Sequence, residues 1–120
     1  MATTHAEVAS ICCVVAPDQS RDELYIVTQR TVNGGTKRYI EYMSKTWEST
    51  DEQEDAFYTD CGWTVVNDPP TDTVTGLWFL EGETVGVYVD GTTHVDCVVT
   101  NGKITVDRDA TIITLGYFYN

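Results

Sequence analysis

Positive charge is scarce in this 120-residue sequence, which has seven Lys and Arg residues against nineteen Asp and Glu residues and a formal net charge of −12. Such a surface repels phosphate backbones and anionic lipid headgroups, so we expect no direct nucleic-acid partner. Long apolar runs are also missing, because none approaches the roughly 18 residues that a membrane-spanning helix needs. The first seven residues lack the basic and apolar regions of a secretion signal. We therefore expect no membrane partner either.

The usual motifs of metal, phosphate and acyl-transfer sites are absent from the sequence. His5 and His94 are the two imidazoles, and there is no Cys-x-x-Cys or His-x-x-x-His spacing that would predict a zinc site. No Gly-x-Ser-x-Gly motif is present. Asn33-Gly34-Gly35 joins two expected strands and does not open a helix onto a phosphate. The sequence therefore predicts no catalytic residue, no metal and no cofactor.

Two groups of carboxylates remain as candidates for chemistry. The run 51–55 (Asp-Glu-Gln-Glu-Asp) lacks the spacing and the glycine of an EF-hand loop, which favours a solvated acidic loop. Glu81 and Glu83 would share one face of a strand, as a glycosidase or metal site could use. Because they flank Gly82, turn-flanking surface charges are the favoured interpretation. A small hydrolase built on such pairs stays a third hypothesis without a convergent set of residues.

Cysteine is sparse as well, with Cys12, Cys13, Cys61 and Cys97 as the four thiols. Successive side chains of a strand point to opposite faces, so Cys12 and Cys13 are poorly placed to pair with each other. A chain of this length does not need disulfides for stability. We expect buried free thiols made in a reducing cytosol, with two disulfides as the alternative.

Strand patterns fill the first part of the chain. Residues 7–16 form a β-favouring run that predicts a strand buried on both faces for part of its length. Residues 23–32 and 37–43 alternate between polar and apolar side chains around Asn33-Gly34, which predicts a hairpin. Together these segments predict a three-stranded antiparallel sheet.

The later part of the chain predicts further strands. Residues 57–66 resemble one or two short strands broken at Gly62, and residues 67–70 form a loop by composition. An alternating strand after Gly82 is reversed by Asp90-Gly91, and Asn101-Gly102 joins segments 93–100 and 103–107. Residues 109–119 complete what we expect to be a small barrel-like meander.

The expected fold class is all-β, an antiparallel hairpin sheet followed by a small β-barrel or meander. Composition divides the chain into a hairpin sheet (1–50), an acidic and proline-containing connection with short strands (51–72) and the barrel meander (73–120). The connection around 44–54 has room for one helical turn. The large aromatic residues are expected mostly as core, with a sugar-stacking platform as the alternative. The residues assigned to the core on this ground are Tyr25, Trp63, Trp78 and Tyr88.

Several short motifs follow one another in a set order. They lie at 7–11, 22–27, 30–34, 38–41, 55–62, 75–77, 80–85, 90–91 and 115–117, with Gly76-Leu77 through Val85 plus Asp90-Gly91 as the sharpest element. The ordered set resembles a segment of tailed-phage structural proteins of the tail-tube or nozzle kind. That resemblance implies a propeller-like hairpin interrupted by a small β-barrel, similar to the first catalytic cysteine half-domain (FCCH) of ubiquitin-activating enzymes. It would imply a fold and no ubiquitin chemistry.

The resemblance further implies a structural component of a bacteriophage tail (tube, nozzle or hub) that acts through subunit assembly without catalysis. Its partners would be other virion tail subunits, including copies of itself, and its location the virion, after synthesis in the host cytoplasm. Neighbouring subunits would cover the edge strands. An acidic wall in or near the tail channel would repel the DNA phosphates, so that DNA passes without binding. Members of this family are longer, so the resemblance implies one module of a larger virion protein or a free-standing relative of it, with the next strand expected at the apolar end, 112–119. The alternative is a binding module in which aromatic residues of 51–70 and the hairpin tips hold a glycan or a host surface protein.

Overall fold

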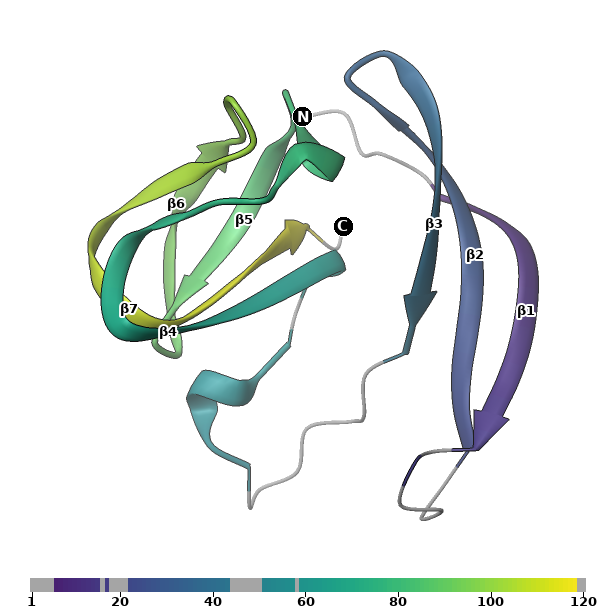
Figure 1. Ribbon diagram of the computed structural model, residues 1–120, viewed down its shortest axis with the longest axis horizontal. Helices are drawn as coiled ribbons and strands as arrows, with labels where there is room; N and C mark the ends of the chain where they lie inside the picture. The colour runs from purple at the N-terminus through teal and green to yellow at the C-terminus, as the bar shows by residue number, and fades with distance from the viewer. Residues whose placement is uncertain (1–5, 16, 18–21, 44–50, 58, 119–120) are drawn as a thin grey trace. The chain divides into compact units, whose positions relative to one another are not determined.

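The computed structural model describes residues 6–15, 17, 22–43, 51–57 and 59–118. These residues form seven β-strands, all paired antiparallel, and contain no α-helix. The chain divides into two compact units, residues 1–46 and 47–120, each with its own sheet (Figure 1). The expected all-β class is confirmed.

The first unit is a three-stranded sheet in the order β1-β2-β3. Its strands are β1 (Glu7–Val15), β2 (Asp22–Val32) and β3 (Gly35–Tyr42). Asn33 and Gly34 connect β2 to β3 with φ values of 49° and 75°, the positive values that a two-residue hairpin turn needs to match the twist of its strands. The predicted sheet and its hairpin are therefore present.

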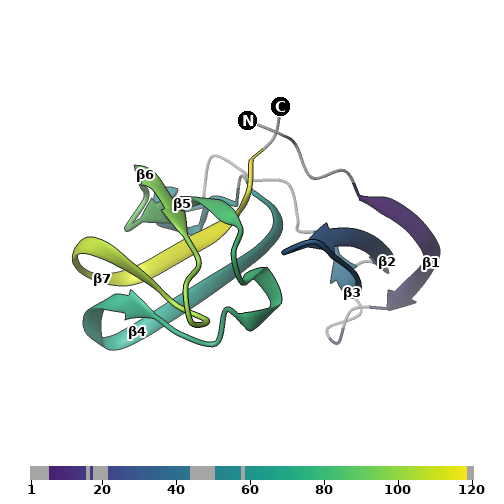
Figure 2. The same cartoon turned by 90° about the horizontal axis from the view of Figure 1, so that it is seen from above.

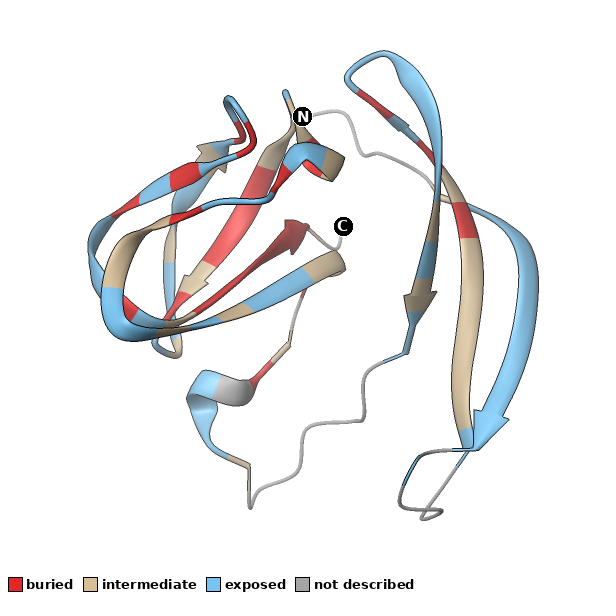
Figure 3. Cartoon of the chain, viewed as in Figure 1, coloured by how far each residue is buried: buried red, intermediate tan, exposed pale blue. Residues whose placement is uncertain are grey.

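The burial expected for the first strand is wrong. Every residue of β1 is exposed, which Figure 3 shows as a continuous pale blue ribbon. A run of Val, Ile and Cys indicates that a segment suits a pleated strand, but it does not specify what covers either face. β1 is an edge strand whose ladder partner is β2 alone, so the apolar run stays open to solvent.

The second unit is a four-stranded sheet in the order β4-β7-β5-β6. Its strands are β4 (Asp60–Val74), β5 (Thr84–Val89), β6 (Thr92–Val98) and β7 (Ile104–Tyr117). Two single turns of 3-10 helix, η1 (Gln53–Asp55) and η2 (Trp78–Leu80), lie before β4 and β5. η1 is the helical turn for which the connection has room, while residues 44–50 lie outside the described part of the chain.

The strand order differs from the predicted meander. β7 lies between β4 and β5, so consecutive strands β6 and β7 are not ladder partners (Figures 1 and 2). β4 and β6 are the two edges and do not pair with each other within the described residues. The sheet is consequently open and does not close into the expected barrel.

Two predicted boundaries between strands are also wrong. The two strands expected at 103–107 and 109–119 are one long strand, β7 (Ile104–Tyr117), and the expected loop 67–70 lies inside β4. The pairing of β4 with β7 is irregular between Val66 and Thr71, and there the Asn67 side chain donates to the Ala110 carbonyl at 3.1 Å. The prolines are tolerated because β4 is an edge strand with a local bulge. Gly62 marks a second irregularity of β4, not a break.

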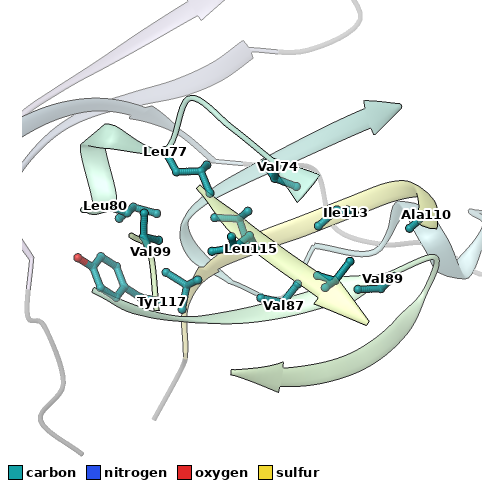
Figure 4. Close-up of a cluster of buried hydrophobic side chains, with 13 residues drawn as sticks. Val74, Leu77, Leu80, Val87, Val89, Val99, Ala110, Ile113, Leu115 and Tyr117 are labelled. Carbon is teal, nitrogen blue, oxygen red and sulfur yellow. The ribbon is translucent and has the colours of Figure 1, made fainter. Parts of the chain in front are cut away.

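The hydrophobic core of the second unit lies mainly between β5, β7 and the segment around η2. Leu77, Leu80, Val85, Ile113 and Leu115 are fully buried, and in Figure 4 the labelled side chains of this cluster point toward one another. Asp90 links the β5–β6 turn to β7, because its carboxylate Oδ1 accepts hydrogen bonds from the backbone N–H groups of Thr111 and Ile112 at 3.1 and 2.8 Å. The turns of the sheet are thus fixed by specific bonds as well as by burial.

Candidate functional site

The first unit presents an apolar sheet face, which we call the tyrosine face. In an antiparallel ladder, directly opposed residues lie on the same face. The register opposes Cys12, Tyr25 and Tyr42 across the three strands, and Val27 opposes Ile40. The complete set is Cys12, Val14, Tyr25, Val27, Ile40 and Tyr42. These residues share one side because alternate side chains of a strand point to the same face.

The tyrosine face is open to solvent. Ile40 is 78% exposed, Tyr42 is 62% exposed and Val14 is 45% exposed. The rings of Tyr25 and Tyr42 contact each other with centroids 5.8 Å apart. The two rings are therefore held against each other in the absence of a bound partner. A contiguous apolar patch of this kind on a polar chain is typical of an interaction surface.

Charged groups border this face at its two ends. Glu23 accepts a hydrogen bond from the Tyr25 hydroxyl at 3.2 Å, and this bond, followed by the charge of Glu23, raises the pKa of Tyr25. Tyr25 therefore remains a neutral hydrogen-bond donor at physiological pH. At the other end, Arg38 donates from Nε to the Gln29 side chain at 3.4 Å.

The opposite face of the same sheet differs strongly. Thr28, Arg30 and Val32 alternate along β2 and are all buried. Arg30 forms an ion pair with Glu41 of β3, and the Thr28 hydroxyl donates to the same carboxylate. Burial on this face is confined to these residues of β2, because Val8, Ile11 and Val15 of β1 lie on the same face and are 58%, 64% and 61% exposed. The tyrosine face differs in its paired aromatic rings and in having no buried polar cluster.

A Cys–His–Asp cluster in the second unit has the composition of a nucleophilic triad. Cys97 Sγ lies 3.9 Å from Nδ1 of His94, and Asp107 Oδ1 lies 3.4 Å from Nε2 of the same ring. Nδ1 is 2.8 Å from the Val95 carbonyl, which can only accept, so Nδ1 carries the proton. Nε2 accepts from the Asp107 backbone N–H at 3.2 Å.

His94 therefore cannot serve as the base of that cluster, because the nitrogen nearest the thiol already donates its proton to a carbonyl. Burial, and then the charge of Asp96, raise the pKa of the Cys97 thiol, which is opposite to the activation that a nucleophilic cysteine needs. His94 instead connects β6 to β7 through backbone hydrogen bonds.

The carboxylate pair Glu81 and Glu83 does not lie on a strand, because β5 begins at Thr84. Glu81 accepts backbone hydrogen bonds from Asn101 and Gly102 at 2.9 and 2.7 Å, so it holds the turn before β7. In the described part of the chain, no three His, Cys, Asp or Glu side chains gather as a metal site would require.

The aromatic residues predicted for the core divide between two environments. Tyr25 and Tyr88 are partly buried, whereas Trp63 and Trp78 are 52% and 61% exposed. The expectation that the two tryptophans are core is wrong, because β4 is an edge strand and η2 directs only Leu80 fully inward. Trp63 contacts Phe79 with ring centroids 5.8 Å apart.

All four cysteines are free thiols, as the favoured interpretation predicted. Their expected burial is wrong, because Cys12 and Cys13 are exposed and Cys61 and Cys97 are partly buried. The thiols of the first pair follow the exposure of β1.

The tyrosine face was missed at the sequence level, although its signal is the alternation of Tyr25, Val27, Tyr42 and Ile40 on the two hairpin arms. Periodicity shows which residues share a face, but not which face is covered. Among the described residues, no helix has the length and apolar character needed to cross a membrane. In comparisons with known proteins, no family model and no curated protein matches this chain.

Proposed function

We propose that this chain is a non-catalytic structural module that works by assembling with other protein subunits, in the tailed-phage virion that the resemblance implies. The observation that carries the proposal is the exposed tyrosine face of the β1–β3 sheet. Three of its apolar side chains, Val14, Ile40 and Tyr42, are each more than two-fifths exposed. Covering such groups is the main favourable term in protein association.

A second copy of the chain is the partner that we infer. The net charge of −12 opposes contact between copies over most of the surface, but the middle of the tyrosine face carries no charged residue. Glu23 lies at one end of this face, and the row Glu7, Gln29 and Arg38 lies at the other. Two copies packed face to face with their strands antiparallel would bring Glu23 of one copy to the row Glu7, Gln29 and Arg38 of the other, where Arg38 is the cation that Glu23 could pair with.

The size of the face sets the expected affinity. Three strands about 4.8 Å apart and about eight residues long present roughly 400 Å² per copy. That is about half of the ~800 Å² per partner in a standard interface, so we expect a weak dimer in isolation, strengthened by further contacts in an assembly.

Light scattering after gel filtration tests the proposal, with protein loaded from about 10 μM to about 1 mM, the range of weak interfaces. We expect a mass that rises with concentration. Ile40→Lys should abolish the rise, while Val95→Lys, at a 74% exposed position of β6, should leave it unchanged. A mass that stays monomeric across the range, or association that Ile40→Lys does not weaken, contradicts the proposal.

A further inference from the structure

An exposed indole in the second unit is held against a glycine turn. Trp78 is the first residue of η2 and is 61% exposed. A Cβ atom added at Gly102 would overlap the indole at Cε2, Cδ2 and Nε1, so the ring lies directly on the Gly102 backbone. The Leu77 N–H donates to the Gly102 carbonyl at 2.8 Å, which fixes the start of η2 to the same turn. The indole is thus ordered on one side and open on the other.

A carboxylate is fixed at the same turn. Oε1 of Glu81 accepts the Asn101 N–H at 2.9 Å, and Oε2 accepts the Gly102 N–H at 2.7 Å. A carboxylate oxygen can accept two hydrogen bonds, so each oxygen of Glu81 can accept one more from a ligand. The two backbone hydrogen bonds hold the carboxylate in place and leave each oxygen able to accept another hydrogen bond.

The same turn carries two further polar side chains. Asn101 and Lys103 are exposed on either side of Gly102. An amide supplies both donors and acceptors, and an ammonium group supplies donors. The indole of Trp78 and the carboxylate of Glu81 therefore both contact the turn that carries the Asn101 amide. This four-residue turn is closed by a bridge between Thr100 and Lys103.

We propose that this turn is a binding site for one pyranose ring of a neutral oligosaccharide. The apolar C–H side of the sugar would stack on the open face of Trp78, and hydroxyls that extend past the edge of the indole toward the turn would donate to Glu81 and bond Asn101. Pre-organisation of the indole and the carboxylate lowers the ordering cost of binding. The charge of −12 disfavours acidic glycans.

NMR titration of the whole chain with cellohexaose and with chitohexaose tests the site through the Trp78 indole Nε1–H signal and through the backbone N–H signals of Asn101 and Gly102, which remain as the readout in Trp78→Ala. We expect a saturable shift with a Kd of about 0.1–1 mM for at least one sugar, the affinity of a small exposed site. Trp78→Ala should weaken binding at least about tenfold, in keeping with the loss of one stacking ring. Asn101→Gly keeps the left-handed turn conformation and removes the amide, so it should weaken binding without unfolding the protein.

Trp63→Ala is the matched control, because it removes the other exposed tryptophan of the described residues, on β4, and should leave the Kd unchanged. Backbone spectra of each variant verify that the fold is retained. No shift with either sugar at about 10 mM, which lies above the expected Kd, would overturn the proposal. Binding that survives Trp78→Ala would do the same. The site shares no residue with the tyrosine face. A negative sugar titration therefore does not contradict the assembly proposal, and a monomeric mass in light scattering does not contradict the sugar-binding proposal.

Discussion

Arg30 and Glu41 form a buried ion pair on one face of the β2–β3 hairpin. Nη2 of Arg30 lies 3.2 Å from each carboxylate oxygen of Glu41, and the two side chains are only 1% and 15% exposed. The Thr28 hydroxyl, between them on the same face, also donates to Glu41. Hydrogen bonds of this kind are what make a buried charge tolerable in a protein interior.

Glu41→Ala should therefore destabilise the first unit strongly. The substitution leaves the Arg30 guanidinium buried without its carboxylate, and breaking such a pair typically costs about 3–5 kcal/mol. Urea denaturation followed by tyrosine fluorescence measures the effect. Arg38→Ala, at an exposed position of β3, should change stability by less than about 0.5 kcal/mol. Similar values for the two variants would contradict the role given to the pair.

Glu81→Ala should loosen the turn before β7. It removes the acceptor of two backbone N–H groups, and hydrogen bonds to a charged group contribute about 1.5–3 kcal/mol when buried. Because Glu81 is only partly buried, we expect a loss of about 1–2 kcal/mol, discounted for solvent screening. Faster amide exchange at Asn101 and Gly102 would localise the effect. Asp96→Ala, at an exposed position of β6, serves as the control and should leave exchange at this turn unchanged.

The sequence predicted local features of the fold well. Asn33-Gly34, Asp90-Gly91 and Asn101-Gly102 all form turns with positive φ at both residues, because these dipeptides adopt that conformation at low cost. The alternation on either side of Asn33-Gly34 and Asp90-Gly91 then defines hairpins, whereas the strands next to Asn101-Gly102 separate after a single bridge. Such signals depend only on residues close in sequence, so they can be recognised in one sequence without the structure.

Features that depend on distant pairing could not be predicted in the same way. β7 inserts between β4 and β5, and no local pattern states which strand will be its neighbour. The same limit explains the exposed Ile40 and Trp78, because an apolar side chain suits a core or an interaction surface equally well. The convergence of Glu81 on the Asn101-Gly102 turn joins residues some twenty positions apart and likewise needed the structure.

Gly116→Ala should destabilise the second unit. Gly116 of β7 faces Gly86 of β5, and a Cβ at position 116 would lie only 2.7 Å from the Asp60 carbonyl oxygen. Backbone atoms cannot move aside cheaply, so we expect a loss of about 1–3 kcal/mol from overpacking. Gly35→Ala is the control, since its Cβ would meet nothing closer than 3.7 Å. Thermal unfolding should show a lower Tm for the first variant and an unchanged or higher one for the second.

The reactivity of Cys97 should follow its environment. Burial, and then the charge of Asp96, raise the pKa of this thiol, so at any pH near 8.5 a smaller fraction is thiolate than in an ordinary cysteine. Because the thiolate is the reactive form, alkylation of Cys97 by iodoacetamide should be slower in the folded chain than in the urea-unfolded chain. As the pH is raised, the rate in the folded chain should still increase at pH values where the rate in the unfolded chain has reached its plateau. Asp96→Asn lowers the pKa part of the way and should speed the reaction at pH 8.5. Peptide mass spectrometry resolves the rate at Cys97 from those at the exposed Cys12 and Cys13, and equal rates at Cys97 in the folded and unfolded chains would show that the environment does not control this thiol.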